Sequence, residues 1–157
     1  IKVLLARMTA HLEAASGVRS QTSDYLVEGR GRFEIEHIWA DHPERHADEF
    51  PSAADFHDWR NRFGGLLLLP KTFNASYGDL PYAEKRQHYV TQNLLARSLH
   101  EQCYERHPGF LDYARQAELP FRALPQFRKA EMEERQQLYR RLADEVWSPQ
   151  RLAREAP

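Results

Sequence analysis

A carboxylate and an imidazole stand side by side at the end of a predicted strand, in the segment FEIEHIWADH that begins at Phe33. Apolar side chains at 33 and 35 alternate with Glu34 and Glu36, which is the period-2 pattern of a half-buried strand. His37 then occupies a position where this pattern asks for an apolar side chain. Two interpretations follow. Either Glu36 binds a metal ion and His37 activates a water molecule, or His37 is a packed histidine beside a solvent-facing glutamate.

Further polar side chains follow in an order that suits phosphodiester hydrolysis. Asn74 lies in a predicted loop, and Lys85 and Tyr89 lie one turn apart on a predicted helix. Imidazole titrates near neutral pH and can deprotonate water. A carboxylate and an amide oxygen suffice as protein ligands for Mg²⁺, which keeps several waters, and a lysine can stabilise charge on the phosphate.

Two short strands and several helices must position these residues. The predicted strands are Phe33 to His37 and the apolar run Leu66 to Pro70. Helices are predicted at 1–15, 52–63, 81–100 and 129–146, with a last one starting at Ser148-Pro149. Segment 71–79 is predicted to be a loop because it is rich in Asn, Ser and Gly. The first helix is predicted to bury Ile1, Leu4, Leu5, Met8 and Leu12 and to stop at Gly17.

Together these elements predict an α+β fold that is mainly helical. A ββα core at about 33–100, two short strands and a helix surrounded by additional helices, would continue into a helical tail at 101–157. The 157 residues suit a single domain. The chain starts at Ile1 inside a predicted helix, and we therefore expect it to be a C-terminal fragment of a larger protein.

The composition indicates a globular protein of a reducing compartment. Hydrophobic residues make up 41% of the chain and charged residues 29%, and no apolar run approaches the length that spans a membrane. The single Cys103 excludes an intramolecular disulfide and a zinc ribbon built on paired CxxC knuckles, so we expect a cytoplasmic protein. The net charge of −1 gives no general attraction to nucleic acid. However, the acidic segment 34–58 is followed by a more basic one at 59–97.

The segments IEHIWA, DWRNR and FGGLLLLPKTFNASYGDLPYAEKRQHY resemble the C-terminal nuclease domain of GmrSD-type restriction endonucleases, an HNH or His-Me finger domain. That family combines a (D/E)HI strand, a segment close to LGNLTLL, a following Asn and a K-x-x-x-Y helix. The later helical part is similar to longer members, including restriction proteins that sense phosphorothioate-modified DNA. The resemblance implies a DNA endonuclease or nickase of phage defence that uses Mg²⁺ or Mn²⁺. It also implies an N-terminal nucleotide-hydrolysing domain as partner, and possible oligomers through the full-length protein.

Carried over by position, the resemblance makes His37 the general base and Glu36 a metal ligand. Asn74 becomes the second ligand or the residue that orients the active-site loop, and Lys85 faces the phosphate. The predicted catalytic residues are therefore His37, Asn74 and Lys85. The predicted DNA contacts are Arg30, Arg32, Lys71, Lys85, Arg86 and Tyr89.

One position departs from the family pattern. Gly65 stands where the family has the Asn of LGNLTLL, a residue that braces the loop holding the catalytic histidine. Asn61, four residues earlier, is the candidate substitute.

Three other interpretations remain open at this stage. The first is a non-catalytic DNA-binding or interaction module that keeps the nuclease fold, and Gly65 favours it. The second is a zinc site on His42 and His46, which are spaced i, i+4 but have no clear third ligand. The third concerns the basic side chains of the helix at 129–146, which by default form a solvated face: Arg135, Arg140 and Arg141.

Overall fold

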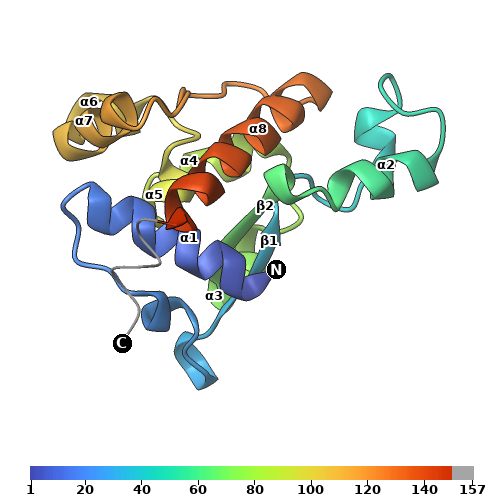
Figure 1. The fold of residues 1–157 in the computed structure, drawn as a ribbon. Helices are drawn as coiled ribbons and strands as arrows, with labels where there is room; N and C mark the ends of the chain where they lie inside the picture. Colours follow the sequence, from blue (N-terminus) through green and yellow to red (C-terminus); the bar gives the residue numbers. More distant parts are fainter. Residues whose placement is uncertain (150–157) are drawn as a thin grey trace.

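A two-stranded antiparallel sheet carries the candidate residues in the computed structural model, which describes residues 1–149 (Figure 1). Strand β1 is Phe33–His37 and strand β2 is Leu66–Pro70. The register pairs Phe33 with Pro70 and His37 with Leu66. Both strands lie where the alternating and the apolar patterns predict them.

The outer edge of β2 is closed by side chains rather than by a third strand. All four leucines of β2 are buried. The Tyr139 hydroxyl donates to the Leu66 carbonyl oxygen at 2.8 Å, and the Asn93 amide donates to that of Leu68 at 2.7 Å. These contacts satisfy backbone acceptors that would otherwise be buried without partners, and they block pairing with another chain.

Residues 1–149 contain eight α-helices around this hairpin, so the mainly helical α+β fold is confirmed. In Figure 1, α8 crosses the region above the hairpin, while α2 and the segment before it project to one side. Buried apolar residues from α1, β2, α5 and α8 belong to one hydrophobic core. The helices are α1 Lys2–Ala15, α2 Ala53–Arg60, α3 Lys71–Tyr77, α4 Tyr82–Tyr89, α5 Leu94–Arg97, α6 Gln102–Arg106, α7 Pro108–Gln116 and α8 Lys129–Val146. Short 3₁₀ turns occupy Thr22–Tyr25, Gly29–Gly31, Pro43–His46 and Phe63–Gly65.

The buried face of α1 differs in part from the prediction. Leu5, Met8 and Leu12 are buried as expected, but Ile1 and Leu4 are exposed. The helix instead buries polar side chains on the same face. Among them, Glu13 accepts hydrogen bonds from the Tyr25 hydroxyl and from the Leu94 backbone N–H at the start of α5. The helix ends at Ala15, just before the predicted stop at Gly17, whose φ of +82° is the left-handed conformation that glycine tolerates best.

The predicted loop at 71–79 is wrong, because α3 fills most of it. Pro70 stands just before the helix and Gly78 closes it, so the turn-forming residues lie at its ends. The predicted helix 81–100 is also interrupted. It becomes α4 and α5, because the side chain of Asn93 accepts from Ala96 N–H and starts a new helix. Helix α2 begins at the predicted Ser52 cap and ends at Arg60, before the predicted end.

Helix α8 has the predicted bounds, yet its basic residues do not all face solvent. Arg135 is buried and donates to the Leu95 carbonyl oxygen at 2.7 Å and to the Tyr139 hydroxyl. The expectation of a solvated face is therefore wrong for Arg135, whereas Arg140 is exposed. The last predicted helix lies beyond Pro149, outside the described residues. Cys103 on α6 is fully buried. None of the helices within 1–149 is long and apolar enough to cross a membrane.

Candidate nuclease site

The end of β1 separates the two adjacent polar residues, because successive side chains of a strand point to opposite faces. Glu36 is buried, with 3% of its surface exposed, and points toward α4. Its Oε1 accepts a hydrogen bond from Lys85 Nζ at 2.7 Å and one from the Tyr89 hydroxyl at 3.3 Å. The interpretation of a solvent-facing glutamate is therefore wrong, and the carboxylate is held from α4.

Lys85 is fully buried, and its ammonium group makes its contacts inside the protein. Besides Glu36, its ammonium group donates to the His37 carbonyl oxygen at 2.8 Å. Burial lowers the pKa of Lys85 and raises the pKa of Glu36, while the charge of each partner opposes these shifts. In this arrangement Lys85 fixes the backbone and the carboxylate on either side of the Glu36–His37 peptide unit. A direct contact with DNA would require it to leave both hydrogen bonds.

His37 lies on the other face of β1, where its ring is half-buried. Its Nε2 is 3.0 Å from Asn61 Oδ1. Because an amide oxygen only accepts, the imidazole presents Nε2–H there and keeps the lone pair on Nδ1. Burial, followed by the charge of Arg60, lowers the pKa of His37, which leaves the ring neutral at neutral pH. Asn61 therefore reaches the histidine, and its role as the substitute for the missing family Asn stays a prediction.

Asn74 lies on α3, not in a loop, and its two amide atoms differ in their contacts. Its Nδ2 donates to the Ile35 carbonyl oxygen at 3.2 Å, which fixes the orientation of the amide. Its Oδ1 is buried and makes no hydrogen bond within the described residues. A buried oxygen acceptor without a donor is energetically costly, and a hard cation accepts such an oxygen as a ligand. The carboxylate of Glu36 and this amide oxygen are donors of the type that Mg²⁺ or Mn²⁺ prefers, and their role as metal ligands stays a prediction.

Gly65, the position of the missing family Asn, lies against α8. A Cβ built at Gly65 would be 2.5 Å from Met132 Cε and 2.9 Å from Met132 Sδ. The Met132 side chain thus occupies the space that a larger residue at 65 would need.

The other predicted DNA contacts divide into two groups. Arg30 and Lys71 are exposed, and Arg32 is half-exposed in an ion pair with Glu34. Lys71 N–H donates to the Arg32 carbonyl oxygen, so this group lies at the opposite end of the hairpin from His37, roughly 13 Å along β1.

The second group, Arg86 and Tyr89 on α4, is buried. Arg86 pairs with Glu101 and donates to the Leu99 carbonyl oxygen at 3.1 Å, which ties α4 to the segment after α5. Tyr89 stacks on Phe73 of α3, with ring centroids 5.5 Å apart, and bonds Glu36. Their contact with DNA stays a prediction. In the structure they hold α3, α4 and β1 together.

Arg60 is a residue to which the sequence gave us no role. It ends α2, directly before Asn61, and its Nε donates to the Trp39 carbonyl oxygen at 3.0 Å. The sequence shows only that Arg60 lies in the DWRNR segment between the two strands. The tertiary contact that turns it toward His37 leaves no mark in the sequence.

The pair His42 and His46 does not form the start of a zinc site. They flank and end a 3₁₀ turn, and His42 bonds Glu44 and Asp79. His46 packs against Trp39, at a centroid distance of 4.5 Å, and against Phe56. Within residues 1–149, no group of three or more His, Cys, Asp or Glu side chains is placed to hold a metal ion.

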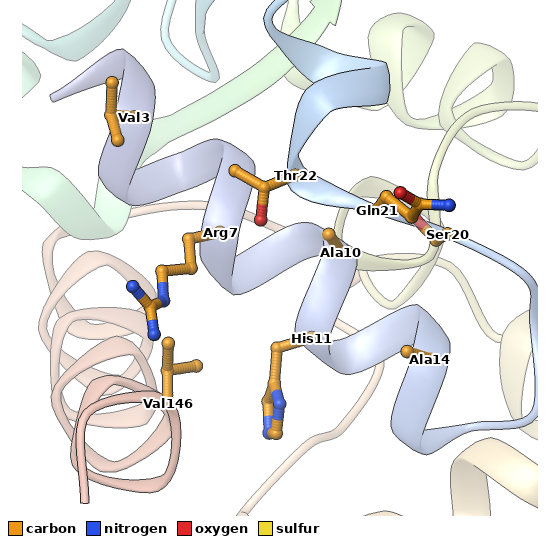
Figure 2. A pocket seen from close by; sticks show the side chains of 9 residues that line it. All are labelled: Val3, Arg7, Ala10, His11, Ala14, Ser20, Gln21, Thr22 and Val146. Atoms are coloured by element: carbon orange, nitrogen blue, oxygen red, sulfur yellow. The ribbon is translucent and has the colours of Figure 1, made fainter. Parts of the chain in front are cut away.

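A separate pocket of about 370 Å³ runs along α1 and is also lined by segment 20–22 and by Val146 (Figure 2). Figure 2 shows Arg7 and His11 leaving α1 on the side of Val146. None of the candidate site residues lines this pocket.

Comparison with known proteins gives one match. A family model described as the C-terminal domain of GmrSD restriction endonucleases matches residues 1–142. No curated protein and no solved structure matches the chain.

Proposed function

The chain belongs to the family of C-terminal domains of GmrSD restriction endonucleases, and on that premise we propose that it hydrolyses DNA phosphodiester bonds at His37. The observation that carries the proposal is the neutral, half-buried imidazole held by Asn61 at the end of β1. Two further groups support it. The carboxylate of Glu36 is buried on the opposite face of the strand, and the buried amide oxygen of Asn74 on α3 has no hydrogen-bond donor within the described residues.

The proposed reaction begins with proton transfer from water to His37 Nδ1. Asn61 keeps Nε2 protonated, so a single nitrogen is available as the base. The oxygen of that water then attacks phosphorus, and the departing 3′ oxygen leaves. Lys85 contributes by holding the Glu36 carboxylate and the His37 carbonyl group in place, which makes it a positioning residue.

Glu36 and Asn74 are the residues that would hold a divalent cation. When bound, Mg²⁺ or Mn²⁺ supplies charge neutralisation at the phosphate and at the leaving oxygen. Lys85 and Tyr89 both bond Oε1 of Glu36, and no hydrogen bond within the described residues uses Oε2. Asn74 Oδ1 likewise accepts no hydrogen bond within the described residues. These two oxygens form the proposed protein ligand set.

One such site cuts one strand, so the proposed product of a single encounter is a nick. The exposed Arg30 and Lys71, at the far end of the hairpin, are the proposed contacts with neighbouring phosphates. A nucleotide-hydrolysing domain and the cytoplasm remain the proposed partner and compartment.

The experiment is nicking of supercoiled plasmid by the purified chain with Mg²⁺, Mn²⁺ or EDTA. We expect metal-dependent nicking that His37→Ala abolishes. We also expect Asn61→Ala to slow nicking by roughly 10- to 100-fold while Asn61→Asp, which keeps an acceptor for Nε2–H, retains most of it. Circular dichroism and thermal unfolding of each variant control for folding.

Two results would contradict the proposal. Equal nicking by His37→Ala and the wild type would remove His37 as the base. DNA binding that depends on salt and survives His37→Ala, with no cleavage by either protein, would select the non-catalytic DNA-binding module instead.

A further inference from the structure

The proposed reaction leaves the scissile phosphate without a cation from the protein. Phosphoryl transfer is promoted by fixed positive groups at the phosphate oxygens. Lys85, predicted for this role, has no exposed surface and bonds Glu36 and the His37 carbonyl oxygen. The phosphate therefore has to find another positive group at the end of β1.

Arg60 is placed to supply that group. It is adjacent to Asn61, whose side chain contacts His37, and its own Nε bonds the carbonyl oxygen of Trp39, two residues after His37. Both residues at the C-terminal end of α2 thus turn toward the same strand end. The partial negative charge of a helix C-terminus also favours a cation there.

The two terminal nitrogens of the Arg60 guanidinium group make no hydrogen bond within the described residues. Within the described residues, Nε makes the one hydrogen bond of this side chain, and neither terminal nitrogen takes part in an ion pair. Asp41, a carboxylate whose pKa the charge of Arg60 lowers, instead bonds His57 Nε2 at 2.8 Å. Arg60 is half-buried, so part of the group reaches the surface. A guanidinium with one edge anchored and the other free is suited to bidentate binding of phosphate oxygens.

Electrostatic effects agree with this placement. After burial, the charge of Arg60 is the largest contribution that lowers the pKa of His37, and it also acts on the pKa of Glu36 and of Asp41. The charge of one arginine therefore affects the pKa of the proposed base, of the proposed metal ligand and of the neighbouring aspartate.

We propose that Arg60 is a further catalytic residue, whose terminal guanidinium nitrogens bind the non-bridging oxygens of the scissile phosphate beside His37. This inference rests on the proposed nuclease function and assigns to Arg60 the phosphate contact that the sequence predicted for Lys85. The anchoring bond to Trp39 fixes the group before the substrate arrives, so little reorganisation accompanies the reaction.

The test compares single-turnover nicking of a labelled duplex by the wild type, Arg60→Gln, Arg60→Lys and His37→Ala. Arg140→Gln on α8 is the matched control, because it removes an exposed arginine that lies outside the proposed site. We expect Arg60→Gln to lose about 10²–10³-fold in rate, Arg60→Lys to recover part of that loss, and Arg140→Gln to match the wild type. Thermal unfolding checks that each variant folds.

A second measurement separates catalysis from general binding. Fluorescence anisotropy with a duplex in EDTA should show that Arg60→Gln weakens DNA affinity by less than about tenfold, with a salt slope reduced by about one phosphate contact. A rate loss much larger than the affinity loss supports a transition-state role, whereas equal losses would overturn it in favour of simple binding.

The remaining outcomes distinguish this inference from its premise. If His37→Ala is inactive and Arg60→Gln nicks as fast as the wild type, the inference on Arg60 fails and the proposed function stands. If the wild type does not nick with either metal, or His37→Ala nicks normally, the proposed function fails and Arg60 has no such reaction to serve.

Discussion

A buried ion pair underlies the candidate site at the scale of single residues. Glu36 and Lys85 leave water together, with side-chain exposures of 4% and 1% and a separation of 2.7 Å. Desolvation of two charges offsets much of their attraction, so such a pair need not stabilise the fold relative to an apolar pair. Removing one partner is different, because the remaining charge stays buried without compensation.

We therefore predict that Lys85→Met lowers the free energy of unfolding by about 3–5 kcal/mol. The double variant with Glu36→Gln should lose less than the sum of the two single losses, since neither charge is then left alone. Urea denaturation of the four proteins measures this coupling. Lys71→Met, which alters an exposed lysine, should stay within about 0.5 kcal/mol of the wild type. Additive losses would show that the two side chains do not interact.

His46 gives a pH dependence that is independent of the site. Its ring packs on Trp39 and Phe56, and burial lowers its pKa below the ordinary 6.5, while Glu49 and Asp48 oppose this shift and Arg128 adds to it. Below pH 6.5 the unfolded chain therefore binds more protons at this residue than the folded protein does. The stability should fall as the pH drops from about 6.5 through the lowered pKa, and it should not depend on His46 above that range.

The variant His46→Phe removes this titration and keeps an aromatic ring in the cluster. We predict that its melting temperature falls less than that of the wild type between pH 7 and pH 5. Every other histidine is common to both proteins, so the difference between the two curves reports on His46. Parallel curves would mean that His46 has the same pKa in the folded and unfolded states.

Residue types predicted part of the site and missed what tertiary contacts decide. The adjacent Glu36 and His37, and the later Asn74, were selected because their order suits hydrolysis, and their roles stay predictions. The burial of Lys85 could not be read from its helix, because a lysine between tyrosines is compatible with either face. Arg60 was missed for the same reason: its direction depends on the Trp39 carbonyl group, which belongs to another element.

At the scale of elements, two adjacent glycines let α8 lie against the turn before β2. A Cβ at Gly64 would be 2.6 Å from Gln136 N and 2.9 Å from the Met132 carbonyl oxygen, both backbone atoms. At Gly65 the closest atoms are the far end of the flexible Met132 side chain. The first glycine is therefore required by the helix, while the second faces a neighbour that can move.

This contrast predicts unequal effects of the same substitution. Gly64→Ala should cost about 2–3 kcal/mol because α8 has to shift, and Gly65→Ala should cost less than about 1 kcal/mol because Met132 can change rotamer. Chemical denaturation of both variants measures the difference. Similar losses would mean that α8 and the turn are not packed as the structure has them.

Elements with a clear hydrophobic period or a clear cap were predictable. Elements whose residues are compatible with both a helix and a turn were not. The strands and α8 followed from alternation, from an apolar run and from a long amphipathic pattern. Helix α3 was missed because Asn74, Ser76 and Gly78 suggested a loop, although the first two lie on the helix and Gly78 caps its end. The break between α4 and α5 depends on Asn93, which caps α5 and also bonds Leu68 of the sheet.

The whole molecule carries almost no net charge, with a value of −1. Non-specific DNA affinity comes mainly from phosphate contacts by Lys and Arg, and several arginines here are paired or buried: Arg86, Arg122, Arg128 and Arg135. The chain by itself should therefore hold DNA weakly.

We predict a dissociation constant in the range of about 10⁻⁴–10⁻⁶ M for duplex DNA at physiological salt. Anisotropy titrations at several salt concentrations give both the affinity and the number of phosphate contacts. Nanomolar binding at physiological salt would contradict the prediction and would place a strong DNA-binding surface on this chain.

The burial of Cys103 has a practical consequence for all of these measurements. It is the one thiol of the chain, its side chain has no exposed surface, and burial raises its pKa to about 12. A thiol in this state reacts with alkylating reagents only when the surrounding helices open. The rate at which Cys103 is modified therefore measures the opening of the native protein, and it requires no added label. A second cysteine introduced on the surface would take up a dye alone, leaving Cys103 unmarked.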